Sequence, residues 1–326
     1  MTHNRQTLVQ AVVAACWLVG ASSAIWAQDA YPNRAISIIV PYAAGGTTDL
    51  LARAIQRPMQ EFLKQPVIIE NKAGAGGTIG TDQVVKSAPD GYTLVFGNSG
   101  PNAIASLMRK IPYDPIKDLR PIATVALTPM ILAVPADSPA KTLKEFLVLA
   151  KQNSDKWNYG SVGNGSLSHL TGEYFNALTG LKLLHVPYQG GAPMMTAFGG
   201  GQLQAAFVTG LDGAGMFQAG RVRYLAVATP QRTSVVPGLP ALAEEIPGFR
   251  SVAWFGVLAP AGVSDTVINR LNQAVEFAVT RPDVQKMFAD RNIEPRAGKP
   301  DDLARLIQGE MSQWGDVIKR ANIKAD

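Results

Sequence analysis

The feature that most restricts the fold of this chain is a repeated unit near its start: a short β-branched strand, a glycine-rich loop and a helix. Residues 36–40 read Ile-Ser-Ile-Ile-Val, which predicts a strand, and residues 48–63 carry apolar side chains at helical spacing. A strand over 67–69, a helix over 77–86 and a strand over 92–96 follow. Strands that alternate with helices in this way predict a parallel sheet with right-handed crossovers.

The rest of the chain continues as α/β structure in a less regular order. Strands at 122–127 and 130–134 follow each other with only a short gap, and we find no flexible linker or internal repeat. We therefore predict two lobes that are joined by crossing strands, and a cleft between lobes is a usual place for a small ligand. The further predicted strands are 157–161, 183–188, 203–209, 224–229 and 252–258, and the further predicted helices are 143–152, 168–178, 194–199, 264–279, 282–291 and 303–319.

The composition excludes several kinds of site. The 326 residues include one Cys and three His, which rules out a disulfide framework and a zinc site with several thiolates and leaves little support for a His-rich metal centre. The net charge of +5 is small for this length, and no run of Lys and Arg resembles a nucleic-acid-binding patch. We expect no metal, no cofactor and no nucleic-acid partner.

Residues 1–27 are predicted to be a secretory signal peptide. One Arg and no acid lie among the first seven residues, an apolar stretch spans 8–20, and small residues lead to Ala27. Cleavage is expected after Ala27, with Ala24 as the alternative, and a cut after Ala27 leaves a mature chain without Cys, which suits an oxidising compartment. A lipid anchor at Cys16 is not favoured because Cys16 lies midway through the apolar stretch. No later apolar segment is long enough to predict a membrane span.

Two glycine-rich loops follow the first two strands, at 41–49 and 71–80. Both are expected at the carboxyl ends of parallel strands, where open α/β sheets bind ligands. Glycines bring backbone N–H groups close to a ligand, and each following helix begins there with its positive dipole end, so the loops predict an anion site. Thr47, Thr48 and Thr78 are candidate hydroxyl donors. The alternative is that the loops only form turns and that Thr47 caps its helix.

The fingerprints of nucleotide-binding loops are absent. Ile79 stands where a dinucleotide-binding motif needs Gly or Ala, and no Lys follows either loop as it does in a phosphate-binding loop. The anion is therefore predicted to be a carboxylate rather than a pyrophosphate.

A third loop, 160–170, also follows a predicted strand and precedes a predicted helix. Ser166 and His169 lie three residues apart, but the Gly-x-Ser-x-Gly motif of Ser hydrolases is absent, and a triad would also need a placed acid. Ser166 is therefore interpreted as a helix cap or an anion donor. Asp212 follows another predicted strand and is a candidate to face the cleft. Trp254 and Phe255, in the predicted strand 252–258, are most simply core residues, although a strand that crosses between lobes could show one of the two rings to a ligand.

Several motifs recur along the mature chain in a characteristic order. Residues 39–49 read Ile-Val-Pro-Tyr-Ala-Ala-Gly-Gly-Thr-Thr-Asp and residues 71–77 read Asn-Lys-Ala-Gly-Ala-Gly-Gly. His-Val-Pro-Tyr stands at 185–188, Leu-Ala-Val-Ala-Thr at 225–229 and Trp-Phe-Gly-Val-Leu-Ala-Pro-Ala-Gly at 254–262. Together with Tyr-Pro-Asn-Arg at 31–34 and the loop 161–170, this series resembles the Bug/TctC family, the extracytoplasmic substrate-binding proteins of tripartite tricarboxylate transporters.

The resemblance implies a two-lobed α/β fold of the periplasmic-binding-protein type (type II-like), in which each lobe has a central, mostly parallel sheet flanked by helices. It places lobe 1 at 28–125 and 252–326, lobe 2 at 126–251, and the ligand cleft between them. The first two glycine loops would bind a ligand carboxylate through backbone N–H groups and bridging waters. The candidate ligand-binding residues are Tyr42, Ala43, Ala44, Gly46, Thr47, Thr48, Gly76, Gly77, Thr78, Ser99, Ser161, Ser166, His169 and Asp212.

The function implied by the resemblance is that of a monomeric periplasmic receptor, not an enzyme. It would capture a small organic acid, expected to be a di- or tricarboxylate, and deliver it to the membrane components of a tripartite tricarboxylate-type transporter. The chain departs from the family pattern at Tyr42, at Ala44 and over 209–212, near the expected ligand. The alternatives are an exported Ser hydrolase that uses Ser166 and His169, and a ligand sensor for a signalling ectodomain.

Overall fold

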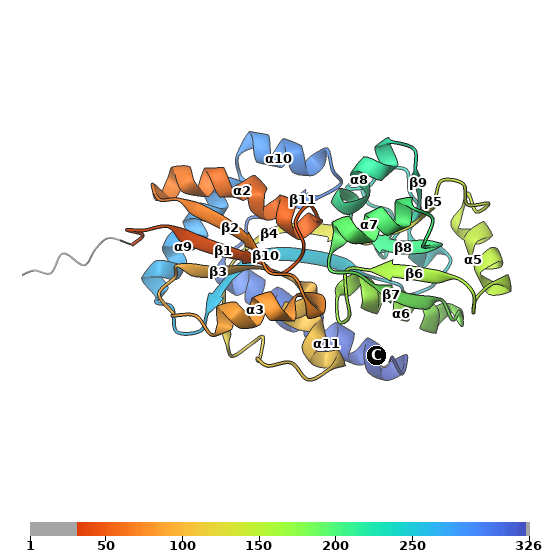
Figure 1. The fold of residues 1–326 in the computed structure, drawn as a ribbon, viewed down its shortest axis with the longest axis horizontal. Coiled ribbons are helices and arrows are strands. Elements are labelled where there is room, and N and C mark those ends of the chain that lie inside the picture. Colours follow the sequence, from red (N-terminus) through yellow and green to blue (C-terminus); the bar gives the residue numbers. More distant parts are fainter. Residues whose placement is uncertain (1–30, 324–326) are drawn as a thin grey trace, which may run out of the picture. The chain divides into compact units, whose positions relative to one another are not determined.

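The computed structural model describes residues 31–323, so the predicted signal peptide, its cleavage site and Cys16 lie outside the described residues. From Arg34 onward the chain forms one compact unit that contains two β-sheets (Figure 1). Both sheets are flanked by helices, as the alternation of strand and helix patterns predicts. Among residues 31–323, no helix is both long and apolar enough to span a bilayer.

The first sheet consists of β1 (Ile36–Val40), β2 (Val67–Asn71), β3 (Thr93–Asn98), β4 (Leu119–Pro129), β10 (Val252–Pro260) and β11 (Glu294–Pro295). Its strand order is β11-β4-β10-β3-β1-β2. β1 pairs in parallel with β2 and β3, as predicted, and Ile38 of β1 stands opposite Ile69 and Leu94. β10 runs antiparallel to β3 and β4, and β11 runs antiparallel to β4.

The second sheet consists of β5 (Ile131–Pro135), β6 (Asn158–Ser161), β7 (Leu184–Pro187), β8 (Ala205–Val208) and β9 (Val222–Val227). Its strand order is β7-β6-β8-β5-β9. β6 pairs in parallel with β7 and β8, whereas β5 runs antiparallel to β8 and β9. Both sheets are therefore more mixed than the mostly parallel sheets expected, because the strands next to the crossings, β4, β5, β9 and β10, pair antiparallel.

The helices cover both sheets. They are α2 (Thr47–Leu63), α3 (Thr78–Val85), α4 (Ala105–Met108), α5 (Leu143–Gln152), α6 (Leu167–Thr179), α7 (Gly191–Gly199), α8 (Gly210–Gln218), α9 (Asp265–Val279), α10 (Pro282–Ala289) and α11 (Pro300–Arg320), with short turns η1 (Ala75–Gly77), η2 (Gly100–Ile104) and η3 (Leu242–Glu244). Figure 1 shows α2 on one side of the first sheet and α3 and α11 on the other. α6, α7 and α8 pack against the second sheet.

The apolar periodicity of α2 explains its position. Leu51, Ile55 and Met59 lie on one face of the helix and are completely buried. The helix ends at Leu63, and Lys64 follows in the left-handed conformation, with a φ of 58°. Burial of three large apolar side chains contributes roughly 1.5–3 kcal/mol each, which fixes α2 against the first sheet.

Four elements were not predicted from the sequence. They are α8, the strand β11, the short turn η3 and the helical segment formed by η2 and α4. α8 contains three glycines in nine residues, which is typical of a loop, but packing against β8 and β9 holds it as a helix.

Two connections cross between the sheets. β4 leads into β5 through Met130, and the segment 228–251 leads from β9 to β10. Their backbones are hydrogen-bonded to each other: Ala228 N donates to Met130 O (2.7 Å), Met130 N to Ser251 O (3.1 Å) and Ser251 N to Ala228 O (2.7 Å). These connections match the crossing strands expected between two lobes, and the predicted boundaries at 125/126 and 251/252 stay a prediction.

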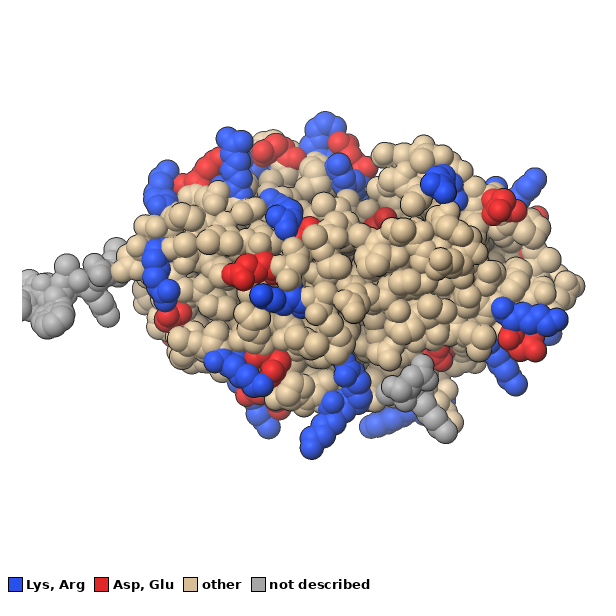
Figure 2. Space-filling model, in the orientation of Figure 1, with Lys and Arg blue, Asp and Glu red and all other residues tan. Residues whose placement is uncertain are grey.

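Charged side chains are distributed over the surface. On the face drawn in Figure 2, Lys and Arg alternate with Asp and Glu mainly along the rim, and the middle of the face is mostly uncharged. Exposed ion pairs such as Arg232–Glu244 (2.9 Å) contribute little to stability. A mixture of both signs is typical of a surface whose charge serves solubility.

Candidate functional site

The first glycine loop ends at an uncapped helix N-terminus. The N-cap of α2 is Gly46, not Thr47 as in the alternative interpretation, and no side chain of its own segment caps it. Instead, Thr47 N donates a hydrogen bond to Asp212 Oδ1 (2.8 Å), and the hydroxyls of Thr47 and Thr209 lie 2.5 Å apart. The position where the sequence predicts a bound anion is therefore in contact with a carboxylate that the chain itself supplies from α8.

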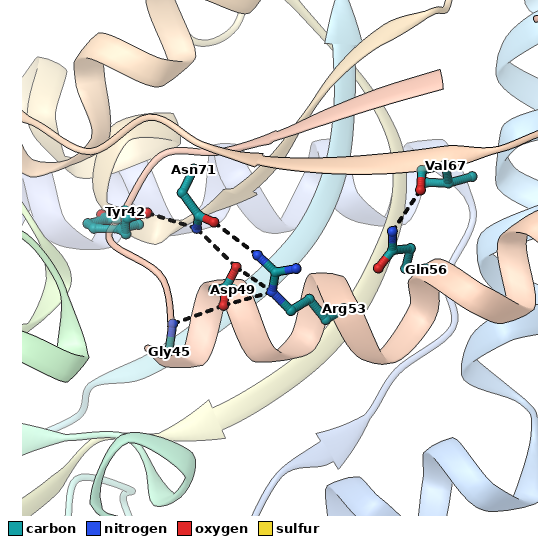
Figure 3. A network of polar contacts seen from close by, with 7 residues as sticks. All are labelled: Tyr42, Gly45, Asp49, Arg53, Gln56, Val67 and Asn71. Carbon is teal, nitrogen blue, oxygen red and sulfur yellow. Dashed lines mark hydrogen bonds and ion pairs between the residues drawn. The ribbon is translucent and has the colours of Figure 1, made fainter. Parts of the chain in front are cut away.

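A polar network holds this loop in place (Figure 3). Asp49 accepts hydrogen bonds from Gly45 N (2.9 Å), Arg53 Nε (2.9 Å) and Asn71 Nδ2 (3.0 Å). Asn71 Nδ2 also donates to Tyr42 O (3.1 Å), which ties the end of β2 to the loop after β1. Burial alone would raise the pKa of Asp49, but the hydrogen bonds from Arg53, Gly45 and Asn71 outweigh it and hold that pKa below its usual value. Asp49 therefore remains ionised and positions the loop.

The second glycine loop uses its donors within itself. Gly77 N donates to Gly74 O (3.0 Å) and Thr78 Oγ1 donates to Ala75 O (2.9 Å). Gly76 lies in the left-handed conformation, with a φ of 63°. A Cβ at this position would come within 2.0 Å of Asn164 O, so the backbones of the second and third loops are in direct contact.

The third loop ends at another helix N-terminus. Ser166 is the N-cap of α6 and accepts a hydrogen bond from His169 N (3.3 Å), as its interpretation as a helix cap predicts. His169 Nδ1 accepts from Gly165 N (3.2 Å), and its ring stacks on His185 at a centroid distance of 3.9 Å. Ser161 Oγ lies 2.6 Å from His185 Nε2. The imidazole of His169 is therefore engaged with backbone and His185.

A cavity of about 50 Å³ lies where the loops of the two sheets meet. Its wall includes Tyr42, Gly46, Thr47, Thr48, Ser99, Ser166 and Asp212 from the predicted set. The structure does not place Ala43, Ala44, Gly76, Gly77, Thr78, Ser161 and His169 in this wall.

Ten further residues line the cavity and were not among the candidates. Of Trp254 and Phe255, both of which are buried, Phe255 lines the cavity and Trp254 does not. The others come from the strands β3, β8 and β10, from loops and from helix starts, and the local sequence does not distinguish them. These residues are Asn98, Met130, Val162, Leu167, Ser168, Gly191, Phe207, Thr209, Ala253 and Phe255.

The positive partial charges in the cavity wall come from backbone dipoles rather than from cationic side chains. The first residues of α2, α6 and α7 and the capped start of α8 all lie in the wall, and each helix N-terminus carries about half a positive charge. The wall contains no Lys, Arg or His, and Asp212 is its single charged residue. Burial raises the pKa of Asp212, and the hydrogen bonds from Thr47 and Thr209 offset this in part.

Tyr42 and Ser99 are buried residues of the cavity wall, and each is hydrogen-bonded to a group behind it. Tyr42 Oη donates to Gly76 O (3.0 Å), and burial raises the pKa of this phenol, so it stays a donor. Ser99 Oγ accepts from Trp254 N (3.3 Å), and the indole Nε1 of Trp254 donates to Glu310 Oε2 (2.5 Å). Burial raises the pKa of Glu310 to about 7, although hydrogen bonds from Ser99 and Trp254 work against this shift.

Two arrangements were sought among the described residues: a group of metal ligands and the Ser–His hydrogen bond of a hydrolase. Within 31–323, no group of three or more His, Cys, Asp or Glu is arranged to hold a metal ion. Ser166 Oγ is engaged with His169 N and with Ser168 Oγ (3.1 Å), so it does not form the hydrogen bond to the His169 ring that a hydrolase would need.

Comparison with known proteins shows the family to which the chain belongs. A sequence profile described as "Tripartite tricarboxylate transporter family receptor" matches residues 51–323. The chain belongs to this receptor family. Protein BugT of Bordetella pertussis is 34% identical to it over 91% of this chain and 92% of its own length. The resemblance to the Bug/TctC family is thereby confirmed.

Three solved structures share the fold. Periplasmic binding protein BugD has a TM-score of 0.87 and 32% identity over 91% of this chain and all of its own. Rpa4515 of R. palustris with adipate has a TM-score of 0.86 and 32% identity over 90% of this chain and 99% of its own. MatC of Rhodopseudomonas palustris with bound malate has a TM-score of 0.84 and 34% identity over 88% and 100%. The two-lobed periplasmic-binding-protein fold is confirmed.

Proposed function

We propose that this chain is a periplasmic receptor that captures a small organic acid and delivers it to the membrane components of a tripartite tricarboxylate-type transporter. The observation that carries the proposal is the cavity at which the N-terminal ends of α2, α6, α7 and α8 converge. Helix N-termini present unpaired N–H donors and favour a carboxylate. Membership of the receptor family and the likeness to structures with adipate and malate support this function.

The ligand is proposed to bind by closure of the two lobes. The crossing segments at Met130, Ala228 and Ser251 form a compact hydrogen-bonded joint, and contacts across the cavity, such as Thr47 N to Asp212, belong to elements of different sheets. A rotation at the joint would separate these contacts without breaking either sheet. The closed form would be the form that the transporter recognises.

The proposed location is the periplasm, reached through a signal peptide that is cut after Ala27, and the receptor is proposed to act as a monomer. Solved structures that share this fold include a protein described as a periplasmic transporter and the periplasmic binding protein BugD. A fusion of residues 1–27 to a reporter that works only outside the cytoplasm should be active, and deletion of 8–20 should abolish that activity.

We also propose that the chain is not an enzyme. The engagement of Ser166 with His169 N and Ser168 opposes the hydrolase alternative. Ser166→Ala should leave ester hydrolysis at the background rate and lower the free energy of unfolding by about 1 kcal/mol, because it removes an N-cap. Ester turnover that disappears in Ser166→Ala would instead support the hydrolase.

The sensor alternative uses the same binding site and differs only in the partner. Co-purification with transporter membrane subunits in the presence of ligand favours delivery, and co-purification with a signalling ectodomain favours sensing.

Native mass spectrometry tests the proposal directly. The mature chain, isolated from the periplasm without unfolding, should carry a small acid that unfolding releases. A folded chain that carries no small molecule and that binds none of a broad set of carboxylic acids would contradict the proposal.

A further inference from the structure

Asp212 stands where a ligand carboxylate would otherwise bind. Its Oδ1 accepts a hydrogen bond from Thr47 N, the first N–H of α2, at 2.8 Å. This N–H is one of the donors that the sequence assigns to an incoming anion. A ligand that takes this donor must therefore leave Asp212 with a new hydrogen-bonding partner.

The Asp212 carboxylate is held in place by its own helix. Thr209 Oγ1 donates to Asp212 Oδ2 (3.0 Å), and Asp212 N donates back to Thr209 Oγ1 (3.2 Å). Gly191 packs so closely that an added Cβ would lie 2.0 Å from Asp212 Oδ1. The carboxylate is therefore a fixed acceptor that faces the cavity, and it has little room to turn away when a ligand arrives.

The summed charge around the cavity is about +1, so about one further negative charge would neutralise it. Four helix N-termini supply about +0.5 each, or about +2 together, and Asp212 contributes −1. No Lys, Arg or His in the wall offsets Asp212. A dicarboxylate would place two more negative charges beside Asp212, which is electrostatically unfavourable in a partly buried site.

A ligand with both a carboxylate and an ammonium group can pair with both partners of the contact between Thr47 N and Asp212. The cavity of about 50 Å³ is the size of a few water molecules, so a ligand must separate Thr47 from Asp212 as it enters. Its carboxylate can then accept from Thr47 N, and its ammonium group can donate to Asp212. Charge-assisted hydrogen bonds of this kind are about twice as strong as neutral ones.

We propose that Asp212 makes this receptor select organic acids that carry a cationic amino group, of the amino-acid type, over dicarboxylates of the same length. This inference rests on the proposed function, since it assigns the ligand class of the same cavity. It replaces the di- or tricarboxylate that the family resemblance suggested with a singly charged carboxylate paired with a cation. The apolar part of the wall, Met130, Val162 and Phe255, would contact the carbon chain between the two groups.

Matched pairs of acids test this inference on the wild-type chain. Calorimetric titration of the mature protein compares succinate with 3-aminopropanoate, glutarate with 4-aminobutanoate, and malate or succinate with aspartate. In at least one pair, the amino acid should bind at least about tenfold more tightly than its dicarboxylate partner. Tighter binding of the dicarboxylate in every pair that binds would overturn the inference and leave the receptor function intact. No binding by any member, with the chain folded, would instead count against the receptor function itself.

Variants of Asp212 test whether its side chain causes the preference for amino acids over dicarboxylates. Asp212→Asn keeps the shape and should reduce the advantage of the amino acid at least about tenfold, while binding of the dicarboxylate is unchanged or improved. Asp155→Asn, which removes an exposed carboxylate outside the cavity wall, is the matched control and should leave both affinities unchanged. Asp212→Ser serves if the Asn variant does not fold. A ratio of affinities that is the same in the wild type and in the folded variant would overturn the role of Asp212.

Discussion

The backbone N–H of Thr47 is predicted to be a main donor to the ligand carboxylate, and Thr47→Pro removes it. Thr47 is the first residue of α2, a position at which proline is well tolerated. The preceding Gly46 has a φ of −85° and a ψ of 172°, an extended conformation that suits the residue before a proline. The substitution should therefore remove the donor without unfolding the helix.

The size of the effect follows from the bonds that are lost. A hydrogen bond from a backbone N–H to a carboxylate contributes about 1.5–3 kcal/mol, which corresponds to a loss of affinity of roughly 10- to 150-fold. Thr47→Pro also removes the hydroxyl that lies 2.5 Å from Thr209 Oγ1. Thr47→Ala removes only this hydroxyl and should weaken binding by roughly 2- to 10-fold, as expected for a neutral hydrogen bond.

The two variants are compared by calorimetric titration with the acid that stabilises the wild type most. Far-ultraviolet circular dichroism and urea unfolding show whether each variant is folded. The expected result is a folded Thr47→Pro variant whose affinity is at least about fivefold below that of Thr47→Ala. Equal affinities for the two folded variants would refute the role of the Thr47 N–H and with it the assignment of the first glycine loop.

Two further predictions concern the loops and the buried acid. Gly76→Ala should destabilise the chain by about 1–2 kcal/mol through its left-handed conformation and should also weaken ligand binding, because the new Cβ would lie 2.0 Å from Asn164 O. Gly180→Ala, with a φ of 71° and no atom within 4 Å, should lose no more stability than Gly76→Ala in urea unfolding and should leave binding unchanged; equal binding losses would be inconsistent with contact between the loops. Since the pKa of Glu310 is raised from 4.5 to about 7 in the folded chain, its contribution is fully present below pH 4.5 and is lost as the pH rises through 7. Relative to Glu310→Gln, the wild type should therefore lose about 3 kcal/mol of unfolding free energy between these limits, and a pH-independent difference would contradict the burial of an ionisable Glu310.

Local patterns predicted most of the fold because most elements bury one clear apolar face. The strand over 36–40 and the helix over 143–152 match β1 and α5 residue for residue, and α2 begins one residue before its predicted start. α8 was missed because its glycines are typical of a loop. The spacing of Thr209 and Asp212, a hydroxyl followed three residues later by an acid, is a capping signal that would have indicated this helix.

The site was predicted less completely because its contacts join distant parts of the chain. Thr47 and Asp212 are 165 residues apart in sequence, and no local pattern pairs them. The second glycine loop has the composition of an anion-binding loop, yet Gly77 N is hydrogen-bonded to Gly74 O, which only the folded loop reveals. Residues such as Phe207 line the cavity because of how two sheets meet, which depends on tertiary packing.

A thermal-shift screen tests the central claim, carboxylate capture by the mature chain, most directly. The chain is unfolded, dialysed and refolded to remove any bound acid, and its melting temperature is then measured with mono-, di- and tricarboxylates and with amino acids. Ligand at about 100 times its dissociation constant adds about 2.7 kcal/mol of stability, which raises the melting temperature by roughly 5 °C. We predict such a rise for one class of acid, and a folded chain that none of these acids stabilises would contradict the proposed function.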